Sequence, residues 1–428
     1  MIKQRLISLS RDKNKKNFII YGIGQAFNLL SPLIVAPLVI SVCRESGFGK
    51  IGLGFALALF LILIVDYAFE IKGTKLASEN RDSPDNLEKL LSTTIIIKSI
   101  LFVAAFGIAV LLIFFIPFFN QEKLLFFLSL AIVFAQIFNP GWFLQGIENF
   151  LLVSIINIGS KVTYVLLVIF FIKQSHDYIL ANFFLGMSSF FFYIGCLAYI
   201  IIKYQFRIYI PKLQEIQIIL KRDFTFCISQ LFLSARQLSP LVLTGYFLGF
   251  AVAGQYKIIE QIITLFRTFS QVYLKFFYAK ACYKFKFDIR EGFQFWKKYA
   301  FFNIGAIAIL LLLILIFSTD LLRFFNLSES SIAGIGQIFR ISLIIPFLIP
   351  FSLALEQLMF INDKSKIYVK ITIFASIINI ALILLTIVPL QLYGIMLSLL
   401  IAEILFIGCY FYNSYLYTKH SIKNENHA

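Results

Sequence analysis

The chain contains twelve apolar stretches, each long enough to cross a lipid bilayer, and together they take up most of its 428 residues. A helix needs about 20 mostly apolar residues to span the hydrocarbon core. The stretches are continuous rather than alternating, which is typical of helices and not of the strands of a membrane barrel. We therefore expect an all-α polytopic membrane protein of about 12 transmembrane helices, with spans at residues 17–43, 48–70, 90–119, 124–147, 151–172, 178–202, 224–249, 254–280, 299–317, 335–361, 367–388 and 391–413.

Composition supports this prediction. Hydrophobic residues make up 60% of the chain and charged residues 14%, whereas about a quarter of the residues of a soluble domain are charged. No loop between the stretches is long enough to fold as a separate domain. The function must therefore concern something that crosses, enters or leaves a membrane.

The formal net charge of +16 invites a nucleic-acid role, but the placement of the basic residues argues against one. If the N-terminus is cytoplasmic, the loops and tails on that side carry 25 Lys and Arg, and those on the opposite side carry five. Short loops with a strong bias are the conditions under which the positive-inside rule applies. We expect both termini in the cytoplasm and a basic rim that faces anionic lipid rather than nucleic acid.

A basic cytoplasmic segment divides the twelve predicted spans into six and six. We expect an N-terminal six-helix half at 1–202, a cytoplasmic linker at 203–222 and a C-terminal six-helix half at 223–428. A weak internal echo agrees, because Ser31-Pro32 in the first span resembles Ser239-Pro240 in the seventh. Transporters built from two such bundles bind their cargo in a cavity between the bundles.

Several ionisable residues fall inside the predicted spans, where charge is costly and seldom faces lipid. Lys161, Arg236, Arg267 and Glu403 lie near the middle of their spans and predict an internal polar cavity, with purely structural ion pairs as the alternative. A second group lies within two or three turns of a helix end, from which a long side chain can snorkel to the interface: Lys98, Lys275, Arg340 and Lys370.

The eighth span carries a polar stripe. Its members are spaced three or four residues apart, which places them on one helical face: Lys257, Glu260, Thr264, Arg267, Gln271 and Lys275. The simplest interpretation is the wall of a water-filled path. Glu260 is spaced to pair with Lys257 or Arg267 along the helix, and neighbouring helices offer alternative partners.

The internal cations outnumber the internal carboxylates, which favours an anionic cargo, since guanidinium and ammonium groups suit phosphate. The candidate substrate-binding residues are Lys161, Arg236, Arg267, Lys257 and Lys98. The candidates for ion coupling are Glu260 and Glu403.

The sequence offers no pattern typical of a metal site, a cofactor or a catalytic centre. Its five cysteines are scattered without a CxxC pair, and its three histidines are dispersed. Gly47-Phe48-Gly49-Lys50-Ile51-Gly52 fits the letters of a dinucleotide motif but lacks the strand and helix around it. We expect no metal, no cofactor and no enzymatic activity.

Three segments give the chain a family resemblance. They are the first hairpin with Asp66-Tyr67-Ala68-Phe69, the segment Pro140-Gly141-Trp142-Phe143-Leu144-Gln145-Gly146-Ile147-Glu148, and the turn from Leu248-Gly249 to Gln255-Tyr256. With them the whole chain resembles the bacterial O-antigen and polysaccharide flippases, the Wzx-type branch of the superfamily that also contains multidrug/toxin extruders and lipid II flippases. The acidic residue that the family often carries near Ser239-Pro240 is absent here.

The resemblance implies a flippase that moves undecaprenyl-diphosphate-linked oligosaccharide, an O-antigen or capsule repeat unit, to the outer leaflet of the bacterial inner membrane by alternating access. It also implies a polysaccharide polymerase and a chain-length regulator as partners, besides the lipid-linked cargo and membrane lipids. Two alternatives stay open: a multidrug/toxin cation antiporter and a membrane-embedded enzyme of glycan assembly. An antiporter would favour internal carboxylates, and an enzyme would usually need a larger outer loop than the one around 318–334.

Overall fold

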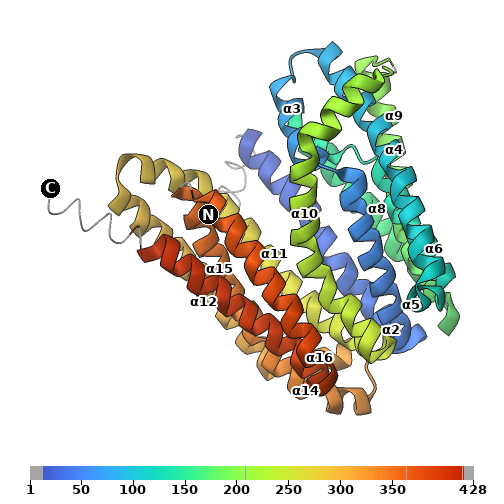
Figure 1. The fold of residues 1–428 in the computed structure, drawn as a ribbon, viewed down its shortest axis with the longest axis vertical. Coiled ribbons are helices and arrows are strands. Elements are labelled where there is room, and N and C mark those ends of the chain that lie inside the picture. Colours follow the sequence, from blue (N-terminus) through green and yellow to red (C-terminus); the bar gives the residue numbers. More distant parts are fainter. Residues whose placement is uncertain (1–12, 208, 363, 417, 419–428) are drawn as a thin grey trace, which may run out of the picture. The chain divides into compact units, whose positions relative to one another are not determined.

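The structure is a computed structural model that describes residues 13–207, 209–362, 364–416 and 418. All regular elements in this part of the chain are helices (Figure 1), so the predicted all-α class is confirmed. The basic residues predicted to lie in the cytoplasm at 1–12 and 419–428 fall outside the described residues.

The chain forms two compact units, residues 1–235 and 236–428. The first unit contains α2 (Lys13–Asp66), a π-helix (Phe69–Gly73), α3 (Thr74–Glu79), α4 (Pro84–Phe115), α5 (Pro117–Asn120), α6 (Lys123–Ile137), α7 (Gly141–Gly146), α8 (Phe150–Phe171), a 3₁₀ turn (Ser175–Asp177) and α9 (Tyr178–Tyr204). The boundary between the units lies within α10 (Leu213–Leu248). The predicted division at 202 and 223 stays a prediction.

Small and polar residues hold the helices of the first unit together. Asn182 on α9 donates hydrogen bonds to the Ile51 carbonyl on α2 and to Ser129 Oγ on α6, each at 2.9 Å. A Cβ atom at Gly54 would lie 2.4 Å from that same Ser129 Oγ. Because lipid offers no hydrophobic drive between helices, close backbone approach and interhelical hydrogen bonds are the expected means of packing.

The predicted linker is attached to the first unit. The Tyr67 hydroxyl donates to the Leu220 carbonyl at 2.6 Å, and Lys72 pairs with Asp223 at 2.5 Å. Nearby, Glu215 accepts a 2.9 Å hydrogen bond from the Tyr209 hydroxyl, which raises the pKa of Tyr209. These contacts fix the beginning of α10 against the π-helix that follows α2.

The second unit contains α11 (Phe250–Phe287), α12 (Ile289–Ile316), α13 (Ser318–Phe324), α14 (Glu329–Ser342), α15 (Ile344–Ile361), α16 (Ser365–Tyr410) and a π-helix (Phe411–Leu416). Gln357 joins three of these helices. It donates to the Leu274 carbonyl at 2.8 Å and accepts from the Tyr299 hydroxyl at 2.5 Å. Both bonds lie in an apolar cluster around Trp296 and Leu358.

Eight helices in the described part of the chain are long and apolar enough to cross a membrane. Two of them, α2 and α16, are each interrupted by one residue with non-helical backbone angles, Arg44 and Gln391, so each holds two of the predicted spans. The seventh and eighth predicted spans lie in α10 and α11, which are less apolar and are not among the eight. The chain is a multi-pass membrane protein, while the exact number of twelve spans stays a prediction.

Large apolar side chains are exposed along these helices, among them Phe115 at 78%, Ile202 at 77% and Leu385 at 74%. In water, apolar area on this scale would be a liability. A lipid environment removes the cost, which fits the membrane assignment.

Candidate functional site

The first unit holds a sealed ion pair. The Lys98 ammonium on α4 contacts the Asp66 carboxylate at the end of α2, and the Lys98 side chain is fully buried. Gln136 on α6 adds a 3.4 Å hydrogen bond to the same carboxylate. The prediction that Lys98 snorkels to the interface is therefore wrong, because Asp66 neutralises its charge inside the bundle. Lys275, Arg340 and Lys370 are exposed, and snorkelling stays a prediction for them.

Lys161 differs from Lys98. It lies on α8 and is half-buried. No hydrogen bond or ion pair joins it to any residue that the structure describes. An ammonium on a membrane helix without a carboxylate partner retains three donors for an anionic ligand.

The segment 140–148, one of the three that carry the family resemblance, has a packing role. Trp142, Phe143 and Leu144 on α7 are buried in one apolar cluster. A Cβ atom at Gly146 would lie 2.5 Å from the Ala77 Cβ atom, so only glycine lets α7 pack this closely on α3. The segment shapes one end of the first unit.

The second unit contains a charged cluster between α11, α15 and α16. Arg267 Nη2 contacts Glu403 Oε1 at 2.9 Å, and the other Glu403 oxygen accepts a 2.9 Å hydrogen bond from Ser352 Oγ. The Glu403 side chain is 6% exposed and the Arg267 side chain 22%. The two charges neutralise each other, and the Arg267 side chain stays partly exposed.

Arg236 belongs to the same cluster. Its guanidinium lies over the Phe406 ring, 4.5 Å from the ring centroid, and interacts electrostatically with Arg267 and Glu403. Among the described residues no carboxylate oxygen comes within 4 Å of it. A cation–π contact leaves the five N–H donors at the guanidinium edge available, since the attraction acts through the face.

The polar stripe of α11 lies opposite a buried apolar side formed by Ile258, Ile259, Ile262 and Phe266. Lys257 and Glu260 pair along the helix at 2.7 Å, one of the arrangements that the spacing allows, and both are partly exposed. Arg267 pairs across to Glu403 rather than back to Glu260.

The structure therefore brings Arg236, Arg267 and Glu403 into one cluster and places Lys257 with Glu260. Lys98 and Lys161 occupy separate positions in the first unit. Asp66, Ser352 and Phe406 belong to these arrangements but were not candidates. Asp66 is an ionisable residue within a predicted span, whereas no sequence signal marks Ser352 or Phe406.

The described residues contain no group of three His, Cys, Asp or Glu that could hold a metal ion. The candidate residues are instead cations and paired carboxylates, and cationic side chains suit an anionic ligand.

Solved transporters of one superfamily have this fold. An inward-facing multidrug resistance MATE family transporter of the MOP superfamily matches with a TM-score of 0.71 at 14% identity, covering 92% of this chain and 95% of that one. The lipid II flippase MurJ in an inward closed conformation matches with a TM-score of 0.70 at 14% identity, covering 92% and 87%. At this identity the likeness establishes the fold alone.

A sequence model described as "Polysaccharide biosynthesis protein" matches residues 15–276, more than half of the chain, and the protein belongs to this family. A Shigella dysenteriae protein named "Putative O-antigen transporter" is 24% identical over 408 residues, covering 92% of this chain and 98% of that protein. The Escherichia coli K12 protein of the same name is 23% identical over 169 residues, or 40% of this chain and 41% of that protein. The recognised resemblance is thus confirmed at the level of the family.

Proposed function

We propose that the protein is a flippase that moves undecaprenyl-diphosphate-linked oligosaccharide from the cytoplasmic to the outer leaflet of the bacterial inner membrane. The family and the curated relatives support a transporter of polysaccharide precursors. The observation that carries the anionic cargo is the state of the internal charges: Asp66, Glu260 and Glu403 are paired, whereas Lys161 and Arg236 have no carboxylate within 4 Å among the described residues.

We propose each of these two cations, by itself, as a contact of the diphosphate during transport. Arg267, Lys257 and Lys98 stay candidates whose charge is already neutralised within the fold. The carrier alternates between two conformations around the bound headgroup while the lipid tail stays in the bilayer. An inside-negative potential assists outward movement of the anion by about 2.3 kcal/mol per charge per 100 mV, so no covalent chemistry and no ATP are needed.

The cation antiporter is less well supported because its cargo would need unpaired carboxylates. Glu356 comes nearest to that description, yet its carboxylate interacts with Tyr368 and with Arg236 and Arg267. The curated relatives are named as transporters, which favours a carrier over the glycan-assembly enzyme. A polysaccharide polymerase and a chain-length regulator stay the proposed protein partners.

Binding of farnesyl diphosphate, a short polyprenyl diphosphate, tests this function with protein in nanodiscs. A hydrogen bond to a charged group is worth about 1.5–3 kcal/mol, so Lys161→Ala and Arg236→Ala should each weaken binding about ten- to a hundredfold. Farnesol, which lacks the diphosphate, should bind equally to all variants. Lys275→Ala, which removes an exposed cation of α11, is the matched control.

Surface polysaccharide in the native host provides the second measurement. The double variant Lys161→Ala, Arg236→Ala should lose export while the protein stays inserted at normal level. Wild-type export and wild-type diphosphate binding by that double variant would refute the anion-binding role.

The proposed orientation places both termini and the linker in the cytoplasm. Single cysteines at Lys13, Gln214 and Asn424 should then stay unlabelled by an impermeant maleimide in intact cells. Labelling at any of the three would overturn the orientation.

A further inference from the structure

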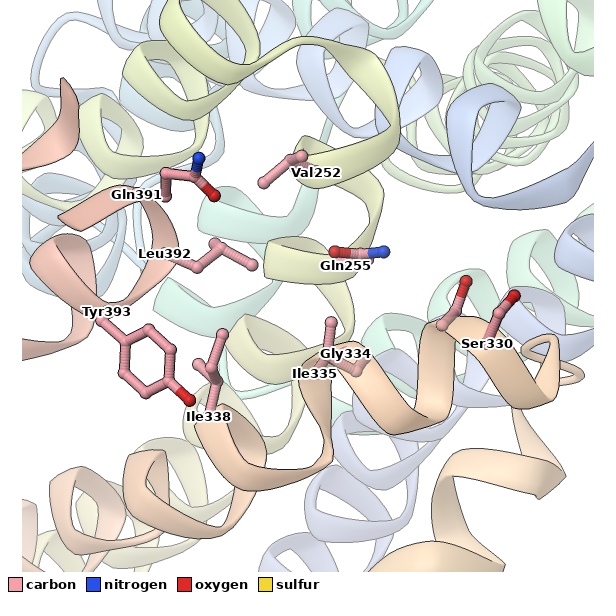
Figure 2. A pocket seen from close by; sticks show the side chains of 10 residues that line it. Val252, Gln255, Ser330, Gly334, Ile335, Ile338, Gln391, Leu392 and Tyr393 are labelled. Carbon is pink, nitrogen blue, oxygen red and sulfur yellow. The ribbon is translucent and has the colours of Figure 1, made fainter. Parts of the chain in front are cut away.

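The second unit contains a cavity that the charged cluster does not use. It has a volume of about 420 Å³ and is lined by the first turns of α11, by α14 and by the break in α16 (Figure 2). Its lining includes Gln255, Ser330, Ser331, Gln391 and Tyr393. The size falls in the range of small-molecule sites, about 300–1,000 Å³.

The chemistry of this cavity differs from that of the cluster around Arg267. None of its ten lining residues is charged. Two amides, two serine hydroxyls and a phenol supply donors and acceptors, while Val252, Ile335 and Leu392 supply apolar surface beside them (Figure 2). A pyranose ring carries hydroxyl groups around its rim and C–H groups on its faces, and so matches a wall of this mixed kind.

The backbone at Gln391 is a second, independent observation. Its angles are φ 50° and ψ −131°, close to the first central position of a type II′ turn, which is normally occupied by glycine. Strained residues of this kind concentrate at ligand-binding sites. The exposed Gln391 side chain makes no hydrogen bond to any other described residue, so nothing within the described fold requires glutamine rather than glycine.

The position of the cavity fits a late step of transport. Its lining comes from the first turns of α11, from α14 and from the break in α16. All three belong to the side with few basic residues, which the charge distribution assigns to the outside. A cargo that emerges there presents its sugars to the protein after its diphosphate has left the cytoplasmic side.

We propose that this cavity binds one uncharged sugar ring of the oligosaccharide cargo. The inference rests on the proposed flippase function and adds a second subsite to it, which recognises neutral sugar where the internal cations recognise diphosphate. Gln391 and Gln255 contribute amide contacts to the ring hydroxyls, and the apolar wall takes a C–H face.

The test measures binding of methyl N-acetyl-β-glucosaminide and methyl β-glucoside by saturation-transfer NMR. The full-length protein is held in phosphatidylcholine nanodiscs, because glycoside detergents would compete for the site. Wild-type protein should give saturable signals with at least one neutral glycoside. Methyl β-glucuronide, which is anionic, should bind at least fivefold more weakly than methyl β-glucoside.

Gln391→Gly is the decisive variant because it removes the amide and accepts the backbone angles. It should weaken glycoside binding at least fivefold while the unfolding midpoint stays equal or rises. Gln255→Ala should weaken binding by a similar factor. Gln271→Ala, at an exposed position farther along α11, should bind as the wild type does.

The outcomes separate the two proposals. Absence of saturable binding by the wild type, unchanged binding by Gln391→Gly, or stronger binding of the glucuronide would overturn the neutral-sugar subsite. Each could occur in a protein that still exports polysaccharide, so the flippase function would survive. Glycoside binding by a protein whose deletion leaves surface polysaccharide intact would support the pocket's chemistry and refute the cargo.

Discussion

The two units hold their internal charges in different ways. In the first unit Lys98 is fully buried against Asp66 and is shut off from any ligand. In the second unit the Arg267 side chain is 22% exposed while it contacts Glu403, and Arg236 stands beside the pair with its guanidinium edge unpaired by any described carboxylate. A sealed pair fixes a fold, whereas an accessible pair beside a spare cation can exchange partners. The comparison predicts that substitutions in the sealed pair will mainly damage stability, and that substitutions in the accessible pairs will mainly damage transport.

The largest effect is expected at the sealed pair. Lys98→Met leaves the Asp66 carboxylate buried without its cation, and removal of one partner of a buried pair costs about 3–5 kcal/mol. The variant should show a strongly lowered unfolding midpoint in nanodiscs and reduced accumulation in the membrane.

A double variant separates the loss of the ion pair from any steric effect of methionine at residue 98. Lys98→Met combined with Asp66→Leu removes both charges and should recover most of the lost stability. If the single variant is as stable as the wild type, the sealed pair has no structural role and the contrast between the units fails.

The accessible pairs should respond with smaller stability losses and larger functional ones. We propose Glu260 as the first and Glu403 as the second candidate for ion coupling. Glu260→Gln and Glu403→Gln each replace a charged hydrogen-bond partner, a change worth about 1.5–3 kcal/mol at most. In reconstituted vesicles, substitution of the coupling residue should abolish the response of transport to an imposed ion gradient. Downhill movement of the cargo should continue.

A purely structural role gives the opposite pattern. The variant would lose stability or all transport, and any residual transport would keep its gradient response. If both variants show this pattern, neither carboxylate carries the ion, and the accessible pairs of the second unit would resemble the sealed pair of the first.

The sequence predicted contacts best between residues that are close together along the chain. Spacing on one helix predicted that Lys257 and Glu260 share a face, and they pair at 2.7 Å. Sequence spacing could not predict which residues on different helices would pair. Arg267 and Glu403 are 136 residues apart, and their contact depends on how α11 and α16 are rotated. Lys98 was misjudged for the same reason, because distance from a helix end does not reveal a carboxylate on a neighbouring helix.

The smallest expected effect concerns two turns with similar backbones. Arg44 lies between the first two predicted spans with φ 59° and ψ 179°, and Gly249 lies between the seventh and eighth with φ 88° and ψ 171°. The second unit thus places glycine where the first places arginine. The Arg44 side chain is exposed and forms no hydrogen bond or ion pair with any described residue.

Arg44→Gly should therefore stabilise the protein. It relieves about 1–3 kcal/mol of backbone strain and adds about 0.5–1 kcal/mol of glycine entropy cost, so a net gain of about 1 kcal/mol follows.

Gly249→Ala should instead destabilise the protein, and the loss would be purely conformational because an added Cβ meets nothing within 4 Å. Gly305→Ala, on α12 with equally open surroundings, is the control and should gain about 0.5–1 kcal/mol. Unfolding midpoints of the three variants in one lipid decide the matter: a loss at Arg44→Gly would mean that the arginine side chain makes a contact that outweighs its strained backbone, and the two turns would no longer be equivalent.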